Sequence, residues 1–191
     1  MAGIGGEILA GFATPDIASF ETREVAALHV DLRGIPGDRH YGFTREAGAR
    51  ERWYPKGESI RSGRQLTLVS REELAQIAGA MDIPFIDPRW LGANVLVQGI
   101  TQFTRIPWCT RLFCGDGAVL VNEGENAPCR FAGAVIARAY PERSELDMLF
   151  VKAARNLRGI VASVERSGVI VPGPVRLRIP PQHNWTGGTL L

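Results

Sequence analysis

The sequence predicts a β-rich α+β fold: a closed or partly open, mostly antiparallel β-barrel with about three flanking helices. Several segments alternate apolar and polar residues with a period of two, which is typical of strands with one buried face. In addition, 22 glycines and 12 prolines are scattered along the whole chain. They separate short apolar runs, as they do in barrels and sandwiches. Helical spacing is confined to a few segments that do not alternate regularly with the strands, which argues against a parallel, helix-flanked sheet.

The clearest strand lies near the C-terminus, where Val175, Leu177 and Ile179 alternate with two arginines. Upstream, residues 111–114 and 118–121 flank a Gly-Asp-Gly sequence, which predicts a β-hairpin. Residues 159–171 contain two apolar runs separated by turn-forming residues, which makes them a further hairpin candidate. Further strands are expected at Gly6–Phe12, Val25–Leu32, Gln65–Val69 and Asn94–Val97.

Three helices are expected from capping residues and apolar spacing. Ser70 and Glu73 have the spacing of a capping box ahead of an apolar stripe. A second helix is expected just after Asn126, which is a candidate cap, with Pro128 in the first turn, where its missing N–H costs nothing. A third is expected to begin at Ser144 and to end before a glycine.

The length and composition limit the classes of protein to consider. A chain of 191 residues suits one domain, expected to span residues 1–191. A net charge of +2 is too small to predict a nucleic-acid partner, and no apolar run is long enough to cross a membrane. The first dozen residues lack the basic segment of a secretory signal, and three cysteines do not suggest a disulfide framework. We therefore expect a cytoplasmic protein with free thiols.

The three cysteines differ in their local context. Cys109 and Cys114 lie five residues apart in predicted strand, without histidines at zinc-site spacing, so we expect both to be buried small hydrophobes. Cys129 follows a polar loop at a predicted helix start, next to Arg130. Unpaired helix N–H groups and a cation favour the thiolate, which attacks electrophiles and binds soft metals. Cys129 is therefore the candidate reactive thiol, and an unreactive thiol is the alternative.

A basic, glycine-rich connection follows the strand that ends near Leu32. Residues 33–42 contain three glycines and one proline, which predict a tight, exposed loop. Such a loop would present backbone N–H groups and the side chains of Arg39 and His40 to an anion such as phosphate. The alternative is a purely structural turn in which Asp38 pairs with Arg39 or caps the loop.

The remaining charged residues indicate less. Arg64 opens a predicted strand, and Arg158 closes a predicted helix, where the helix dipole favours a cation whatever its function. The chain has neither a phosphate-binding Gly-x-x-x-x-Gly-Lys loop nor a nucleophile elbow. Its two lysines, Lys56 and Lys152, lie in no recognisable Schiff-base setting, so we expect no PLP in this chain.

Five segments, taken in order, resemble the MOSC domain, a module found at the C-terminus of molybdenum-cofactor sulfurases and in stand-alone bacterial proteins. The resemblance covers about residues 8–179 and leaves a short C-terminal tail at 180–191. It implies a β-barrel with the cysteine of the Ala-Pro-Cys-Arg segment at its open end. The matching segments are Gly34–Gly42, Arg64–Ser70, Leu91–Gly99, Ala127–Arg130 and Leu157–Ile160.

The resemblance also implies a cofactor and a function. The cofactor is the molybdenum cofactor (molybdopterin), with the Cys129 thiolate as the molybdenum ligand and catalytic residue. Relatives of this kind reduce N-hydroxylated bases and amidoximes, with chemistry supplied by the cofactor. This chain would then be a molybdenum-cofactor-dependent oxidoreductase served by a separate electron-transfer protein. The implied cofactor-binding residues are Arg39, His40, Arg64, Asn94 and Arg130.

Two alternatives stay open at this point. The chain is either a sulfur carrier, whose Cys129 bears a persulfide supplied by a PLP-dependent cysteine desulfurase, or a non-catalytic module that presents a cofactor to a partner. Whether it is an enzyme therefore also stays open. The sequence specifies neither the substrate nor the oligomeric state.

Overall fold

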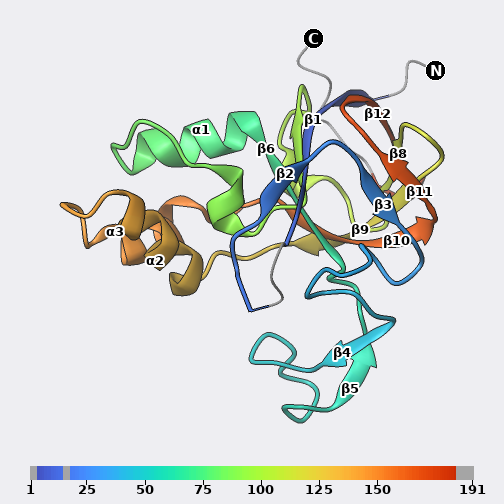
Figure 1. The fold of residues 1–191 in the computed structure, drawn as a ribbon, viewed down its shortest axis with the longest axis horizontal. Coiled ribbons are helices and arrows are strands. Elements are labelled where there is room, and N and C mark those ends of the chain that lie inside the picture. Colours follow the sequence, from blue (N-terminus) through green and yellow to red (C-terminus); the bar gives the residue numbers. More distant parts are fainter. Residues whose placement is uncertain (1–3, 15–17, 184–191) are drawn as a thin grey trace.

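The computed structural model describes residues 4–14 and 18–183, and its centre is a closed barrel of seven strands. In chain order the barrel strands are β1 (Gly5–Ala13), β6 (Leu66–Ser70), β7 (Val95–Gln98), β8 (Arg111–Cys114), β9 (Val119–Glu125), β10 (Ile160–Arg166) and β12 (Gly173–Arg178). Their order around the barrel is β12–β8–β9–β10–β6–β7–β1, and β1 pairs with β12 to close it (Figure 1). Every neighbouring pair is antiparallel except β6 and β7. The predicted fold class is confirmed.

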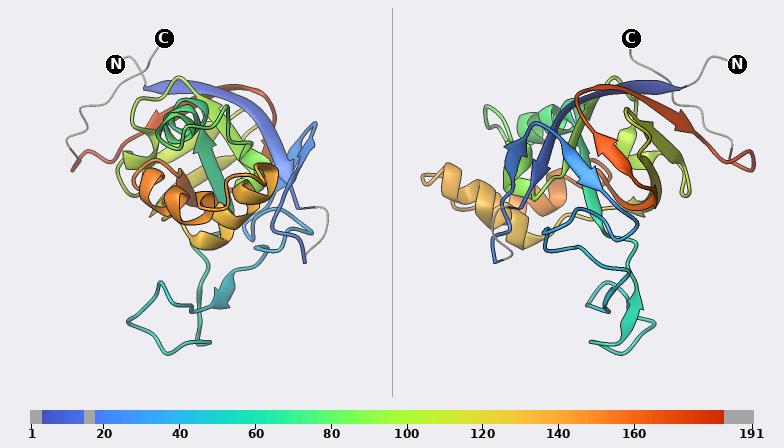
Figure 2. Two further views of the ribbon diagram at one scale, coloured as in Figure 1. Left: turned by 90° about the vertical axis from the view of Figure 1, so that its left-hand side faces the viewer. Right: turned by 45° about the vertical axis from the view of Figure 1, so that its right-hand side comes forward.

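The barrel has an interior core and a second core outside it. Leu66 and Leu68 of β6 point inward with Val95 and Val97 of β7, and each is at most 1% exposed. Because side chains alternate along a strand, Val69 points outward into the second core. That core is covered by α1 (Arg71–Ala80), α2 (Arg130–Ala139) and α3 (Leu146–Ala153), which gather on one side of the barrel (Figures 1 and 2).

The strand predictions are wrong at two places. The segment expected to be one strand at Val25–Leu32 forms β2 (Arg23–Val25) and β3 (Leu28–Val30), separated by a bend at Ala26. β2 pairs with β1, whereas β3 pairs with β11 (Gly168–Ile170). The two apolar runs of residues 159–171 are therefore β10 and β11, which pair with different strands instead of with each other. The remaining predicted strands and the 111–121 hairpin are confirmed.

The helix starts also differ in detail from the prediction. Ser70 caps α1 by accepting a hydrogen bond from the backbone N–H of Glu73. The Glu73 side chain accepts hydrogen bonds from Thr104 instead of from the backbone N–H of Ser70, so only half of the capping box forms. Asn126 does not cap α2, because that helix begins at Arg130 with Cys129 as its N-cap. Helix α3 begins at Leu146, two residues later than expected.

The chain from residue 43 to residue 62 forms an arm that the sequence did not predict. It contains a two-stranded hairpin of β4 (Thr44–Glu46) and β5 (Ser59–Arg61), and it projects away from the barrel (Figures 1 and 2). An ion pair of 2.7 Å between Arg45 and Glu51 stabilises the arm internally.

Two short 3₁₀ helices, η1 (Pro88–Leu91) and η2 (Phe103–Arg105), connect the strands. Residues 184–191 of the predicted C-terminal tail lie outside the described residues. Within the described part of the chain, no helix has the length and apolar character needed to span a membrane.

Candidate functional site

Cys129 lies at the start of α2 with its side chain free of the helix backbone. Its backbone is extended, with φ −140° and ψ 156°, and its carbonyl accepts a hydrogen bond from the N–H of Gly133 at 3.2 Å. The side chain makes no capping hydrogen bond, and the residue is partly exposed and unpaired with another cysteine. The thiol is therefore next to the positive end of a helix and accessible for chemistry.

Arg158 is a buried cation within electrostatic reach of this thiol. It follows α3 and is only 3% exposed, and its Nη2 donates to the carbonyl of Leu91 at 3.2 Å. Its Nε and Nη1 atoms are buried without a hydrogen-bond partner among the described residues. Burial lowers the pKa of Arg158 to about 10; the electrostatic interaction with Cys129 opposes that shift, and the cations of Arg50 and Arg64 add to it.

Arg64 and Arg50 approach Cys129 from the barrel and from the arm. Burial, together with neighbouring cations, lowers the pKa of Arg64 to about 10, and electrostatic interactions with Glu51 and Cys129 oppose the shift. The side-chain carbonyl of Asn126 accepts from Nη2 of Arg64 at 2.8 Å and from Nη1 of Arg50 at 3.2 Å. Nη2 of Arg50 also donates to the carbonyl of Ala127 at 2.8 Å. Asn126 therefore anchors two guanidinium groups to the segment that leads directly into Cys129.

We call Arg50, Arg64, Asn126, Cys129 and Arg158 the Cys129–arginine site. A chain of buried polar groups connects this site to the glycine-rich loop. The amide nitrogen of Asn126 donates to the Thr67 hydroxyl at 3.2 Å, and the backbone N–H of Thr67 donates to Asn94 at 2.9 Å. Asn94, which is 2% exposed, donates in turn to the Asp38 carboxylate at 3.4 Å.

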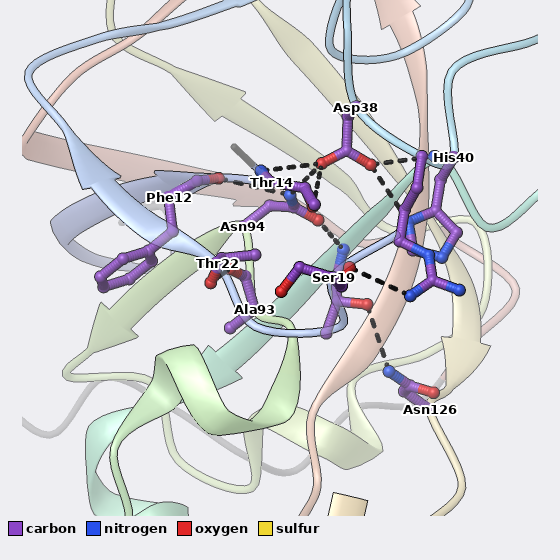
Figure 3. Close-up of polar contacts among 11 residues, drawn as sticks. Phe12, Thr14, Ser19, Thr22, Asp38, His40, Ala93, Asn94 and Asn126 are labelled. Carbon is purple, nitrogen blue, oxygen red and sulfur yellow. Dashed lines mark hydrogen bonds and ion pairs between the residues drawn. The ribbon is translucent and has the colours of Figure 1, made fainter. Parts of the chain in front are cut away.

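The side chain of Asp38 accepts hydrogen bonds that hold the glycine-rich loop in place (Figure 3). Its carboxylate accepts from the Thr14 hydroxyl at 2.9 Å, from the His40 backbone N–H at 2.9 Å, and contacts His40 Nδ1 at 3.1 Å. Burial alone would raise the pKa of Asp38, but the hydrogen bonds from His40 and Thr14 outweigh it and lower the pKa to about 2. Asp38 thus caps the loop, and its side-chain partner in the loop is His40 and not Arg39.

A cavity of about 210 Å³ lies beside the loop. Arg39, His40 and Arg64 line it, together with Tyr41, Thr44, Arg45 and Ser62. Arg64 also contacts Asn126, so the cavity adjoins the Cys129–arginine site through this one side chain. Cys129 is not among the residues that line the cavity. The basic lining suits an anion.

The structure places the predicted site residues in three different settings. Arg39, which also donates to the Ser19 carbonyl at 3.3 Å, shares the 210 Å³ cavity with His40 and Arg64. Asn94 is buried in the polar chain behind that cavity. Arg130 is exposed and pairs with Asp147 on α3 at 2.6 Å.

Sequence reasoning missed three members of the site. The sequence alone presents Arg158 as a cation at a helix end and Asn126 as a helix cap, whereas in the structure Arg158 is buried and Asn126 caps no helix. Nothing in the local sequence distinguished Arg50, which reaches the site only because the arm folds toward Ala127. The one available indication was that Asn126 directly precedes the matched segment 127–130 and that Arg158 lies within the matched segment 157–160.

The other two thiols lie in opposite environments. Cys114 on β8 is buried as predicted, and burial raises its pKa to about 12. The prediction that Cys109 is a buried strand residue is wrong. Cys109 is exposed, with φ 61°, in the turn that precedes β8. Among the residues that the structure describes, no group of three or more His, Cys, Asp or Glu side chains is arranged to hold a metal ion.

Comparison with known proteins identifies the class to which this barrel and its cysteine belong. A family model of the MOSC domain matches residues 37–175. The chain is 44% identical over 163 residues to YuaD of Bacillus subtilis (strain 168), named as a putative metal-sulfur cluster biosynthesis protein, and the match covers 85% of each chain. The chain therefore belongs to the MOSC domain family.

Solved structures agree with this assignment. The crystal structure of the YuaD protein from Bacillus subtilis matches with a TM-score of 0.90 and 38% identity, over 93% of this chain and 97% of that chain. The crystal structure of YiiM from Escherichia coli has a TM-score of 0.57 and 16% identity, over 96% of this chain and 73% of that chain. This second likeness concerns the fold.

Proposed function

We propose that this MOSC protein binds the molybdenum cofactor, with the Cys129 thiolate as the molybdenum ligand, and reduces N-hydroxylated substrates. The observation that carries the proposal is the buried guanidinium of Arg158, which has two unpartnered nitrogens and lies within electrostatic reach of a partly exposed thiol. A buried cation with unsatisfied N–H groups is costly unless an anion pairs with it. The site is therefore suited to a ligand that brings negative charge to Cys129.

The residues present fit an anionic, thiol-bound cofactor. Arg158 and Arg64 bring positive charge within electrostatic reach of Cys129, the residue whose sulfur would ligate a soft metal. Arg39 and His40 would hold the phosphate of the pterin in the cavity that Arg64 shares. When bound, the cofactor supplies the redox chemistry, and the chain contributes the ligand, its orientation and the surrounding positive charge.

The buried polar chain would fix the geometry of this site. Asp38 orients His40, and Asn126 holds Arg50 and Arg64 in place. Asn94 would act behind these residues as a positioning residue, because it connects Asp38 to Thr67. The electrons for the reduction would come from a separate electron-transfer protein.

A second candidate function is sulfur transfer. In this case Cys129 bears a persulfide, and the neighbouring guanidinium groups stabilise its negative charge. The name of YuaD, which refers to metal-sulfur cluster biosynthesis, favours this candidate. The sulfur donor would be a PLP-dependent cysteine desulfurase, which transfers a sulfur atom to the accessible thiol. The third candidate is a module that binds the cofactor without catalysis.

Native mass spectrometry with molybdenum analysis separates these functions. The protein is purified under non-reducing conditions from a host that makes the molybdenum cofactor, as wild type and as the Cys129→Ser and Cys109→Ser variants. We expect the mass of a pterin–molybdenum group in wild type and in Cys109→Ser, and its loss in Cys129→Ser. One added sulfur atom without molybdenum would instead support the sulfur carrier.

Turnover then distinguishes the enzyme from the binding module. The loaded protein is given an N-hydroxylated base and a reductant, and formation of the reduced base is followed. Cofactor retained without turnover supports the binding module. Neither added mass in wild type, or cofactor retained in Cys129→Ser, refutes the role assigned to this thiol.

A further inference from the structure

A second, larger cavity of about 380 Å³ lies between the first turn of α1, the η2 segment and the connection from α3 to β10. None of the residues of the Cys129–arginine site lines it. Its volume is in the range of pockets that bind small metabolites. The polar residues that matter for its chemistry are Glu72, Glu73, Gln102, Arg105, Arg155 and Asn156.

The negative and positive side chains that line this cavity differ in how deeply they are buried. Glu73 is 2% exposed and accepts hydrogen bonds from the backbone N–H of Thr104 at 2.9 Å and from its hydroxyl at 2.6 Å. Arg105 and Arg155 are exposed, and within the described part of the chain neither guanidinium has a hydrogen-bond or ion-pair partner. The cavity therefore has a carboxylate in its buried part and two unpaired cations at its outer part.

Backbone strain is concentrated in the same place. Four non-glycine residues have a positive φ among residues 4–14 and 18–183, and two of them, Gln102 at 50° and Asn156 at 61°, line this cavity. Such conformations cost free energy and cluster at ligand sites, where the surrounding structure maintains them. Their presence in the lining of one cavity is a second feature, separate from the charges, that is typical of a binding site.

We propose that this cavity binds a small zwitterion of the α-amino acid class. Arg105 and Arg155 contact the ligand's carboxylate, and Glu73, with Glu72 beside it, receives the ammonium group. A guanidinium pair recognises a carboxylate through charge-assisted hydrogen bonds, and a buried carboxylate does the same for an ammonium. An anion alone would leave the carboxylates facing it, whereas an amine alone would leave the cations unpaired. This site is separate from the proposed molybdenum site and does not depend on it.

The buried carboxylate also predicts how binding depends on pH. Burial raises the pKa of Glu73 to about 7, the hydrogen bonds from Thr104 oppose this shift, and the negative charges of Glu72 and Glu125 add to it. The cations Arg105 and Arg155 line the same cavity from η2 and from the connection after α3. An ammonium group binds the charged carboxylate better, so affinity is expected to increase as the pH rises through about 7.

Saturation-transfer NMR with small probes tests the proposal. The probes are glycine, L-serine, L-glutamine and L-aspartate, compared with propionate and ethylamine, each of which lacks one charged end. We expect saturation transfer to at least one amino acid and much weaker transfer to propionate and ethylamine. The same titration with Cys129→Ser protein should give the same result, so that loss of the molybdenum or sulfur site does not affect the test.

Matched variants locate the binding. The double variant Arg105→Gln, Arg155→Gln changes only exposed side chains and is expected to weaken binding by roughly tenfold or more. Lys152→Gln, a neighbouring exposed cation that does not line the cavity, is the control and should leave binding unchanged. Glu73→Gln should remove the increase in affinity across pH 7.

Three results would overturn the proposal. The first is that no amino acid binds. The second is that propionate or ethylamine binds as well as the amino acids do. The third is that the double variant binds like the Lys152→Gln control.

Discussion

Replacing Arg158 by methionine should make the protein more stable and less able to bind an anion. Methionine keeps the unbranched chain and removes the guanidinium, which is 3% exposed and has two unpartnered nitrogens. In the unfolded chain those groups are hydrated, so folding without a ligand carries the full cost of burying them. Residues kept for binding often reduce stability in this way.

The size of the effect follows from the hydrogen bonds gained and lost. Relieving two buried, unsatisfied guanidinium nitrogens is worth about 2–6 kcal/mol, because each such polar group costs about 1–3 kcal/mol. The variant also loses the hydrogen bond to the Leu91 carbonyl, which leaves that oxygen unsatisfied at a cost of about 1–3 kcal/mol. With the midpoint of each range, the free energy of unfolding should rise by about 2 kcal/mol, which corresponds to an increase in Tm of roughly 4–8 °C.

Calorimetry and urea unfolding measure this effect, with and without molybdate at a concentration too low for a general salt effect. Molybdate should raise the Tm of wild type and leave that of Arg158→Met unchanged. Arg130→Met is the matched control, because Arg130 is 68% exposed and its surface ion pair is worth about 0–1 kcal/mol. The reasoning is refuted if Arg158→Met is less stable than wild type, or if molybdate stabilises both equally.

Three further predictions concern stability and reactivity. Because burial raises the pKa of Glu73 to about 7 from its usual 4.5, the folded state holds a proton in this window that the unfolded state has lost, and stability falls as pH rises through it. The free energy of unfolding of Glu73→Gln, measured by urea unfolding, should therefore increase by about 1–3 kcal/mol relative to that of wild type as the pH rises through this window. If the difference in stability between the two proteins does not change with pH, this prediction is contradicted. Brief iodoacetamide treatment, mapped by mass spectrometry, should label Cys129 and the exposed Cys109 and leave the buried Cys114 unmodified. Early labelling of Cys114 would contradict this, because it would show that the barrel interior is accessible. Gly133→Ala should lower the free energy of unfolding by about 3 kcal/mol or more, because the new Cβ would lie 2.3 Å from a backbone oxygen of α3. Gly79→Ala on α1, where nothing lies within 4 Å of the new Cβ, should raise the free energy of unfolding by about 0.5–1 kcal/mol. Similar denaturation midpoints for the two glycine variants would contradict the packing argument.

The barrel was predictable because its strands depend on local patterns of burial. Alternation places Val175 and Leu177 on the inner face whatever strand lies beside them, and the structure buries both. The pairing of the short strands was not predictable from such patterns. Whether Leu28–Val30 pairs with β1 or with β11 depends on a bend at Ala26 and on a strand 140 residues away in the sequence. The local alternation of residues contains no information about either.

The candidate site was predictable only where its chemistry is local. Cys129 stood out because a polar loop, a proline and a helix start lie beside it in the sequence. Arg158 did not, because a cation after a helix is common and its burial is a property of the tertiary fold, in which it contacts the Leu91 carbonyl of η1. Arg50 and Asn126 meet across 76 positions of the chain, so their contact is a property of the tertiary fold. The same reason explains why Cys109 was misplaced: its left-handed turn is set by backbone hydrogen bonding to Asn122 on β9.

The position of Arg158 depends on the glycine that follows it. Gly159 has φ +93°, and a Cβ there would lie 2.0 Å from the carbonyl oxygen of Leu68, so only glycine allows the chain to pass this close to β6. Its N–H donates to the Thr104 hydroxyl at 2.7 Å, and its carbonyl accepts from the Asn126 backbone at 2.9 Å. The second of these bonds fixes the backbone beside Arg158 against the same asparagine that holds Arg50 and Arg64. The guanidinium is therefore held in place by the backbone while two of its nitrogens stay unpartnered, an arrangement that folding alone does not favour and that an anionic ligand at Cys129 would stabilise.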